Sequence, residues 1–371
     1  MKNSEDLFIL EKLAKENKIE IIGNNVFMPL WYVLSCTKHS TGNALEMSNL
    51  FANMKYFANV VPDLMGTVTL DCFTDPLYND SGSHDQWNLR NTGQIVGNKN
   101  GVAGVDINLC PALSLLNGIT AEVTVAVIDN GIATDNPDLQ NFTTNSYHVS
   151  SAYNWPPNVP IGPNQLSNHM EKQHGTNVAG IIGAQPNNGI GLAGIAPNCK
   201  ILPISIDFYN DAYRLYEPNR QYMCGNAINL AWHPDYGNAD VINCSWSWAG
   251  YTGNRVNFLS ASIDSALQRG RNGKGCVIVF SAGNQGNNAT LRSMSYPGNE
   301  PNLSDIITVG AIECDGTRLP VSNYGFSTLD VVAPGSYITT TNIGNSSNQY
   351  NEDFGATSAA APHVAGVAAL M

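Results

Sequence analysis

The sequence predicts an α/β fold: a doubly wound, mostly parallel sheet with helices on both faces, preceded by a small α+β unit. Apolar runs rich in β-branched residues alternate with longer helical segments from residue 123 onward. Such runs are typical of parallel strands that are buried on both faces, and a hydrophobic content of 43% supplies a sizeable core. The expected strands are 123–129, 200–206, 240–245, 276–281 and 306–311, and the expected helices are 227–232 and 256–268.

The beginning of the chain has a pattern of its own, with helical spacing on either side of two short strand-like runs. A polar, turn-rich stretch follows, and we expect it to be a linker. The helices expected here are 7–14 and 44–54, and the strands are 19–22 and 31–34. The expected domains are a small unit over 1–66, a linker over 67–85 and a large domain over 86–371.

Charge and hydropathy exclude two classes of partner. The net charge of −12 argues against binding to nucleic acid. No run approaches the roughly 18 apolar residues of a membrane-spanning helix. Residues 1–7 carry charges where a secretory signal peptide needs an apolar core, so we expect no signal peptide in this chain.

The eight cysteines do not fix the cellular compartment. Cys244 and Cys276 fall on expected core strands, where a thiol behaves as a small apolar group. The other six can pair in ways that the sequence does not resolve, and none stands with histidines at the spacing of a zinc site. These six are Cys36, Cys72, Cys110, Cys199, Cys224 and Cys314.

Four polar side chains stand where an expected strand ends or an expected helix begins. Asp129 and Asn284 follow apolar strands. His174 begins a helix of small residues, and Ser358 stands where a glycine-rich turn enters an apolar helix. Open α/β sheets form their sites at the carboxyl ends of the strands. We therefore interpret the four residues as parts of one site.

These residue types are those of acyl transfer by a serine. A serine hydroxyl is a poor nucleophile at neutral pH and needs a base within hydrogen-bond reach. His174 would take the proton of Ser358, and Asp129 would hold the tautomer of that histidine. The Asn284 amide and the Ser358 N–H would stabilise a tetrahedral oxyanion. Taken singly, each residue has a structural alternative as a turn residue or a helix cap.

In their order along the chain, Asp129, His174, Asn284 and Ser358 resemble the catalytic residues of the subtilases, the subtilisin-like serine peptidases. The resemblance extends from about residue 87 to residue 371. It implies a subtilisin-like fold and a serine endopeptidase that forms an acyl-enzyme intermediate and needs no cofactor for its chemistry. The motifs that link the four residues are 191–197, 240–245, 296–298, 322–325 and 332–335.

The sequence departs from the usual subtilase pattern next to two of these residues. Asn130 stands where the family usually has threonine or serine. Ala356 and Ala359 stand where it usually has glycine and methionine. None of these side chains is a reacting group, so we expect activity to survive the changes.

The resemblance also implies partners for the catalytic domain. The small unit resembles a subtilase propeptide with a closing strand at 57–63, which acts as a folding chaperone and intramolecular inhibitor. A simple structural cap is the alternative for this unit. A peptide or protein substrate would pair with Ser245, Trp246 and Ser247, next to a first specificity pocket bordered by Ala282 and Gly283. Because Ser247 replaces the usual glycine, we expect a pocket too narrow for the largest aromatic side chains.

A structural calcium site is a further expectation from the resemblance. Asp138 and Asn188 would give side-chain oxygens, and Ile190 and Leu192 would give carbonyl oxygens. Oxygen ligands of this kind suit Ca²⁺. The alternative is that the Asn-Asn-Gly sequence around Asn188 is an ordinary turn.

Two other interpretations of the chain remain open. Met371 falls inside an apolar helix without a capping signal, so the chain is expected to be a C-terminally incomplete domain. A catalytically inactive peptide-binding protein with a subtilase fold is therefore one alternative. A sedolisin-like peptidase, which uses glutamate as its base, is the other, and His174 argues against it. The resemblance places the protein outside the cell or in the cell envelope.

Overall fold

The computed structural model divides the chain into two compact units, Met1–Thr69 and Leu70–Met371. Each unit is considered by itself. The resemblance to a propeptide predicts a tail near 60–65 that approaches the Ser358 cleft, and residues 62–65 of it, most of the expected linker and most of the 296–298 motif lie outside the described residues. The described residues are 6–24, 28–54, 56–61, 72–78, 85–116, 122–149, 173–206, 217–248, 257–286, 297, 305–325, 329–343 and 349–371.

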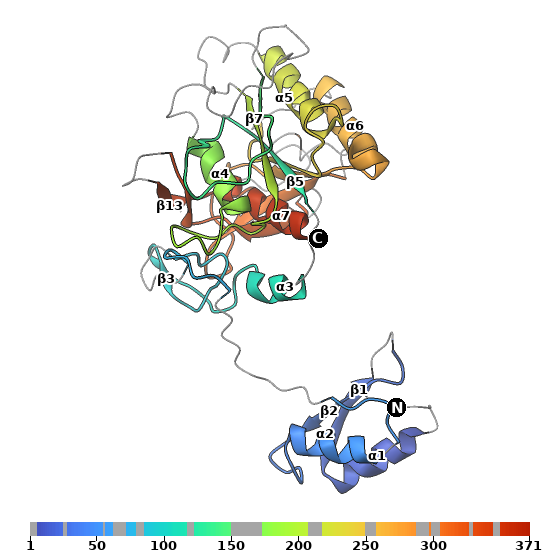
Figure 1. Cartoon of the computed structure of the whole chain (residues 1–371). Coiled ribbons are helices and arrows are strands. Elements are labelled where there is room, and N and C mark those ends of the chain that lie inside the picture. Colours follow the sequence, from blue (N-terminus) through green and yellow to red (C-terminus); the bar gives the residue numbers. More distant parts are fainter. Residues whose placement is uncertain are drawn as a thin grey trace. The chain divides into compact units, whose positions relative to one another are not determined.

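The small unit is an antiparallel β-hairpin with two helices (Figure 1). Its core is formed by apolar side chains from both helices and from the first strand, with Phe57 stacked on Phe51. Residues 57–61 are described and form no strand, so the closing strand expected at 57–63 is wrong over this part. Burial of Phe57 anchors the segment by its side chain instead of by strand pairing. The elements are α1 (Leu7–Glu16), β1 (Ile19–Asn24), β2 (Tyr32–Cys36) and α2 (Ala44–Asn53).

The large unit is built on a seven-stranded sheet in the order β11-β10-β9-β8-β5-β7-β6, in which every neighbouring pair is parallel. This confirms the expected doubly wound α/β fold. The strands are β5 (Thr124–Asp129), β6 (Tyr147–Val149), β7 (Lys200–Ile206), β8 (Val241–Cys244), β9 (Val277–Ser281), β10 (Ile307–Ile312) and β11 (Val331–Pro334).

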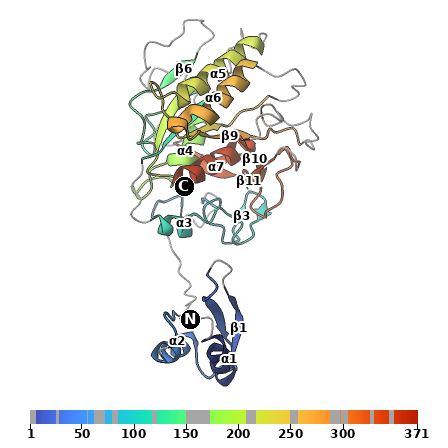
Figure 2. The ribbon, with the colours of Figure 1, turned by 90° about the vertical axis from the view of Figure 1, so that its right-hand side faces the viewer.

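Helices cover both faces of the sheet, α4 and α7 on one and α5 and α6 on the other (Figures 1 and 2). Alternation along β5 explains the two layers, because successive side chains of a strand point to opposite faces. Val125 and Val127 pack into the core with α4 and α7, whereas Ala126 and Ile128 pack with α5 and α6. The helices are α4 (Gln173–Gly183), α5 (Glu217–Trp232), α6 (Asn257–Gly273) and α7 (Thr357–Leu370).

Residues 72–78 belong to the large unit, although the sequence pattern predicts a linker over 67–85. A disulfide joins Cys72 to Cys110 at the start of α3 (Leu109–Leu115). The N–H of Leu77 donates to the carbonyl oxygen of Gly191, 2.8 Å away. The polar composition of residues 72–78 predicted a linker, but the polar groups of this segment form contacts with distant loops.

The segment that follows binds three distant parts of the large unit. The Gln86 amide pairs with the backbone of Ala193, and the Trp87 indole N–H donates to the carbonyl oxygen of Ser336. The Asn88 amide lies 2.8 Å from Nε2 of the buried His363 on α7, whose pKa burial lowers to about 4. These contacts fix the beginning of the large unit against the helix that carries Ser358.

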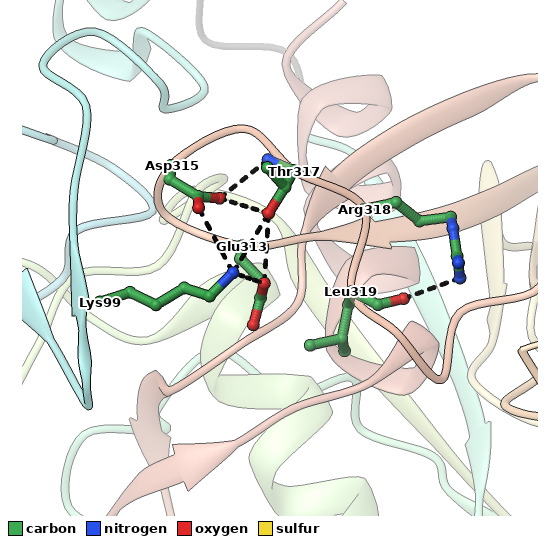
Figure 3. A network of polar contacts seen from close by, with 6 residues as sticks. All are labelled: Lys99, Glu313, Asp315, Thr317, Arg318 and Leu319. Atoms are coloured by element: carbon green, nitrogen blue, oxygen red, sulfur yellow. Dashed lines mark hydrogen bonds and ion pairs between the residues drawn. The ribbon is translucent and has the colours of Figure 1, made fainter.

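An ion-pair network fixes the next hairpin (Figure 3). Lys99 binds Glu313 and lies 3.3 Å from Asp315 and 3.2 Å from the hydroxyl of Thr317, in the turn after β10. The hydrogen bond to Glu313 is the main cause that raises the pKa of Lys99, and hydrogen bonds from Thr317 lower the pKa of Asp315 to about 2. The hairpin strands are β3 (Ile95–Val96) and β4 (Lys99–Asn100), and a second small hairpin pairs β12 (Ile338–Thr341) with β13 (Tyr350–Phe354).

Within the described part of the chain, no helix has both the length and the apolar character needed to cross a bilayer.

Candidate active site

A histidine and an aspartate meet at the carboxyl end of the central strand. Asp129 is the last residue of β5 and is buried, and His174 is the second residue of α4. Nδ1 of His174 lies 2.9 Å from both carboxylate oxygens of Asp129. A carboxylate is an acceptor only, so the proton of neutral His174 is on Nδ1 and Nε2 keeps its lone pair. This tautomer can act as a base at Nε2.

The surroundings of His174 stabilise its protonated form. Burial lowers the pKa of His174, but the charge of Asp129 and the hydrogen bond to it outweigh burial, so the pKa lies above its ordinary value. The side chain is 31% exposed, which leaves one face open to a ligand. Phe354 packs edge-on against the imidazole, with the ring centres 5.4 Å apart. His174 is thus held on two sides and accessible on a third.

Helix α4 packs directly on the turn that follows Asp129. A Cβ atom at Gly175 would lie 2.2 Å from the carbonyl oxygen of Gly131, so only glycine fits. The hydroxyl of Thr176 accepts the N–H of Ala133 at 2.8 Å. Local packing therefore explains the sequence His-Gly-Thr. The glycine permits the close approach of α4 to the turn, and the threonine hydroxyl binds the turn.

Ser358 stands in the first turn of α7 and makes reciprocal contacts with Ser245. Its hydroxyl donates to the Ser245 carbonyl oxygen at 3.1 Å, and the Ser245 hydroxyl donates to the Ser358 carbonyl oxygen at 3.0 Å. Pro362 stands four residues after Ser358 and has no N–H, so it leaves that carbonyl oxygen without its helical partner. In this resting arrangement the Ser358 proton points to Ser245.

The side chain of Asn284, beyond the end of β9, is oriented by Thr357. Its Oδ1 accepts the Thr357 N–H at 3.1 Å and the Thr357 hydroxyl at 2.6 Å. Because both bonds end on the oxygen, the amide NH₂ is the group that can donate to a ligand. Thr357 was not expected to be functional from the sequence. Its position directly before Ser358 could have identified it as part of the site.

The segments expected to bind a substrate follow two neighbouring parallel strands, β8 and β9. Ser245 is buried, and the Trp246 indole N–H donates to the carbonyl oxygen of Ile128 at 2.9 Å. Ala282 is buried beside β10, Gly283 follows it with a φ of 95°, and Ser247 is partly exposed. Both segments therefore lie at the edge of the sheet that carries Asp129.

Comparison with known proteins shows the family of the chain. The subtilase family model matches residues 120–371. The chain belongs to the subtilase family. It is 34% identical over 248 residues to a thermophilic serine proteinase of Bacillus sp. (strain AK1), covering 67% of this chain and 51% of that protein. It is also 34% identical over 268 residues to subtilisin E of Bacillus subtilis (strain 168), covering 72% and 60%. The chain therefore spans between half and three fifths of these relatives.

Solved structures show the same fold. A protease of Pseudoalteromonas arctica matches with a TM-score of 0.57 and 26% identity, over 80% of this chain and 86% of that one. The Aeromonas sobria serine protease, solved in complex with a chaperone, matches with a TM-score of 0.59 and 23% identity, over 77% and 53%. The latter likeness concerns the fold alone.

A pair of buried carboxylates lies away from this edge, in the subtilase loop expected to bind calcium. Asp138 accepts the N–H of Leu192 at 2.9 Å and the amide of Asn188 at 2.7 Å. Asp75 is also buried and accepts the N–H groups of Asn187 and Asn188. Burial is the main cause that raises the pKa of Asp138 to about 6, and the charge of Asp75 adds to it.

Asp75 was not expected as a ligand from the sequence, because an Asp-Pro in a turn-rich stretch is typical of a linker. The structure brings it to the same loop as Asn188, and Ile190 lies in that loop with its N–H bound to the Asn188 side chain. Among the described residues, no three side chains of the types His, Cys, Asp and Glu converge on one point. Any cation here would be held by two carboxylates together with amide and carbonyl oxygens.

Ala356, where subtilases usually have glycine, holds a strained backbone conformation. Its φ of 64° and ψ of −167° lie in a region that essentially only glycine adopts. Hydrogen bonds fix both its backbone groups: its N–H donates to the Gly335 carbonyl oxygen, and its carbonyl oxygen accepts the N–H of Ala359. The entry to α7 is therefore held in place against the preference of the alanine.

Replacing Ala356 with glycine should stabilise the protein. The strain released is about 1–3 kcal/mol, and it exceeds the roughly 0.5–1 kcal/mol that glycine loses through its greater freedom in the unfolded chain. Chemical denaturation measures the difference in the free energy of unfolding. Ala368→Gly in the same helix is the control and should destabilise by about 1 kcal/mol. A loss of stability in Ala356→Gly would contradict the assigned strain.

Proposed function

We propose that this chain is the peptidase part of a serine endopeptidase, with Ser358 as nucleophile, His174 as general base and Asp129 as its partner. The contact between His174 Nδ1 and the Asp129 carboxylate carries the proposal, because it leaves Nε2 as a base at the edge of the sheet where Ser358 stands. Membership of the subtilase family supports it.

The reaction follows from the groups present. His174 takes the hydroxyl proton while the Ser358 oxygen attacks the peptide carbonyl, and it then returns the proton to the leaving amine. Water hydrolyses the resulting acyl-enzyme by the same steps in reverse. The Asn284 amide, with its oxygen bound by Thr357, donates to the tetrahedral oxyanion together with the Ser358 N–H. To start the reaction, the Ser358 hydroxyl must rotate from Ser245 to His174.

Substrate would bind as an extended strand beside residues 245–247, as in β-augmentation. Trp246 is fixed by the hydrogen bond from its indole N–H to the Ile128 carbonyl oxygen and by edge-on packing on Phe280, with the ring centres 5.1 Å apart. A rigid wall of this kind orients a peptide. Ser247 adds a side chain beside the pocket bordered by Ala282 and Gly283, so we expect small or medium side chains to be preferred there.

The test of the nucleophile is labelling with a fluorophosphonate. Ser358→Ala should abolish both labelling and peptide hydrolysis, because the reacting oxygen is gone. Ser265→Ala, a partly exposed serine on α6, is the control and should label like the parent protein. Labelling that persists in Ser358→Ala would contradict the assignment. Binding of peptides without labelling of the parent protein would favour the inactive peptide-binding alternative.

The small unit is proposed to act as an intramolecular inhibitor of the peptidase. Its hairpin leaves large apolar side chains exposed, with Ile22 60%, Trp31 48% and Val33 57% accessible. Exposed apolar patches of this kind mark interaction surfaces. A structural cap with no effect on activity is the alternative.

Residues 1–69, supplied as a separate peptide, should inhibit the peptidase that lacks them. Val33→Glu should weaken inhibition without unfolding the unit, since the side chain is exposed. Glu11→Ala, exposed on α1, should leave the inhibition constant unchanged. If the peptide does not inhibit at high concentration, only the structural-cap interpretation remains.

The loop around Asn188 is proposed to bind calcium. Asp75 and Asp138 are both buried, and two buried carboxylates repel each other unless a cation neutralises them. Their oxygens, the Asn188 amide oxygen after rotation, and the carbonyl oxygens of Ile190 and Leu192 form a set of hard ligands. Bound calcium would neutralise both carboxylates and join residues 72–78 to the loop.

Removing calcium with a chelator should lower the melting temperature of the parent protein. A ligand present at a hundred times its Kd stabilises by about 2.7 kcal/mol, so the shift should be several degrees. Asp138→Asn and Asp75→Asn should reduce the difference between calcium and chelator. Asp106→Asn, a carboxylate that caps loop N–H groups elsewhere, is the control and should keep it. Equal melting temperatures of the parent protein with and without calcium would exclude the site.

The Cys72–Cys110 disulfide supports a location outside the cytosol, in the cell envelope or the medium, because disulfides persist in oxidising compartments. Cell fractionation tests this proposal. Recovery of the protein in the cytosol with both thiols reduced would contradict it.

A further inference from the structure

We propose that Asn130 is a positioning residue that holds His174 against Asp129. It stands next to Asp129 in the turn on which α4 packs, where subtilases usually have threonine or serine. The inference rests on the proposed function, because the two residues that Asn130 positions are the proposed base and its carboxylate partner.

Asn130 contacts both sides of the His174–Asp129 pair. Its backbone N–H donates to Oδ1 of Asp129 at 2.8 Å. Its side-chain oxygen accepts the N–H of Gly175, the residue after His174, at 3.3 Å. The Asn130 side chain is buried, so water does not compete for either bond. One residue thus fixes the carboxylate through its main chain and the imidazole-bearing helix through its side chain.

The second bond uses a donor that the helix itself leaves unpaired. The first N–H groups of an α-helix have no partner within the helix, and Gly175 stands in the first turn of α4. The close packing at Gly175 leaves no room for α4 to slide against Asp129, because a Cβ at Gly175 would lie 3.0 Å from Cβ of Asp129. Asparagine carries its acceptor one atom farther from the backbone than serine or threonine. It can therefore cap a neighbouring helix across this contact.

Apart from Asp129, few charged groups act on the pKa of His174. This pKa is therefore a sensitive measure of the distance between His174 and Asp129. On β13, next to Phe354, Glu352 and Asp353 are exposed, and water screens their charges.

Two buried titratable groups on elements packed around the pair stay neutral. Cys244, at the end of the neighbouring β8, is fully buried, and burial raises its pKa well above the ordinary value. His363 lies farther along α7 and bonds to Ala359 and Asn88. A change in the pKa of His174 therefore reports chiefly on its contact with Asp129.

Asn130→Ala should lower kcat and move the acid limb of the kcat/KM pH profile to lower pH. Without the bond to Gly175, the first turn of α4 can move away from Asp129, and misplacement on the scale of 1 Å lowers kcat by about ten- to a hundredfold. A weaker contact with the carboxylate lowers the pKa of His174. The base then stays unprotonated down to a lower pH, so the acid limb moves in that direction.

Asn130→Asp separates positioning from general stability. It keeps an acceptor for the Gly175 N–H, so kcat should stay within a few-fold of the parent value. It also adds a negative charge beside His174, so the acid limb should move to higher pH. The control is Asn91→Ala, which removes another buried asparagine that accepts a glycine N–H, that of Gly93, but lies far along the chain from the pair. It should lower the melting temperature without moving the acid limb.

Three outcomes would overturn the inference: Asn130→Ala with the kcat and acid limb of the parent, Asn130→Ala and Asn91→Ala with the same pH profile, or Asn130→Asp, which keeps the acceptor, with a kcat more than about tenfold below that of the parent. If Asn130→Ala does not fold, the kcat of Asn130→Asp still decides. A parent protein that neither hydrolyses peptides nor labels at Ser358 would refute the proposed function itself, which is a different result.

Discussion

Helix α7 can place Ser358, the proposed nucleophile, at the site only because it lies close against the sheet, and the reciprocal hydrogen bonds between Ser245 and Ser358 fix it there. Most of its residues are buried and small, so its backbone approaches β8, β9 and β10 more closely than a leucine-rich helix could. Such a helix has no polar face, and its unpaired backbone groups must find partners inside the protein. Pro362 frees the Ser358 carbonyl oxygen for this purpose, and the Ser245 hydroxyl takes it up.

The buried carboxylates of the large unit fall into two arrangements, which differ in what balances their negative charge. Asp129 is buried beside an imidazole that can carry a positive charge, so its ionised form has a partner in the chain. Asp75 and Asp138 are buried and accept hydrogen bonds from backbone and amide N–H groups, which stabilise negative charge without neutralising it. The first arrangement is suited to moving a proton. The second is suited to holding a cation.

The parallel sheet and its two helical layers were predictable because buried β-branched runs alternate with helices, and β5, β7, β8, β9 and β10 lie within a residue or two of their expected bounds. The contact between Asp129 and His174 was expected because Asp129 ends a strand at the edge of the sheet where sites form, and His174 begins a helix. Thr357 and Asp75 were not identified, because each acts through a partner more than 70 residues away in sequence. The strand expected at 57–63 is wrong over the described residues 57–61, because Phe57 is buried by stacking on Phe51.

Two of the departures from the usual subtilase pattern, Ala356 and Asn130, affect the two sides of the site in opposite ways. At Ala356 a residue with a Cβ holds a backbone conformation suited to glycine, so the entry to the helix that carries Ser358 is strained. At Asn130 a longer polar side chain makes a hydrogen bond to the helix that carries His174. Strain persists only where surrounding bonds over-determine the backbone, and both backbone groups of Ala356 are bonded. On the side of His174, rigidity therefore comes from the hydrogen bond of Asn130. On the side of Ser358, rigid surroundings are needed to hold Ala356 in a backbone conformation that alanine disfavours.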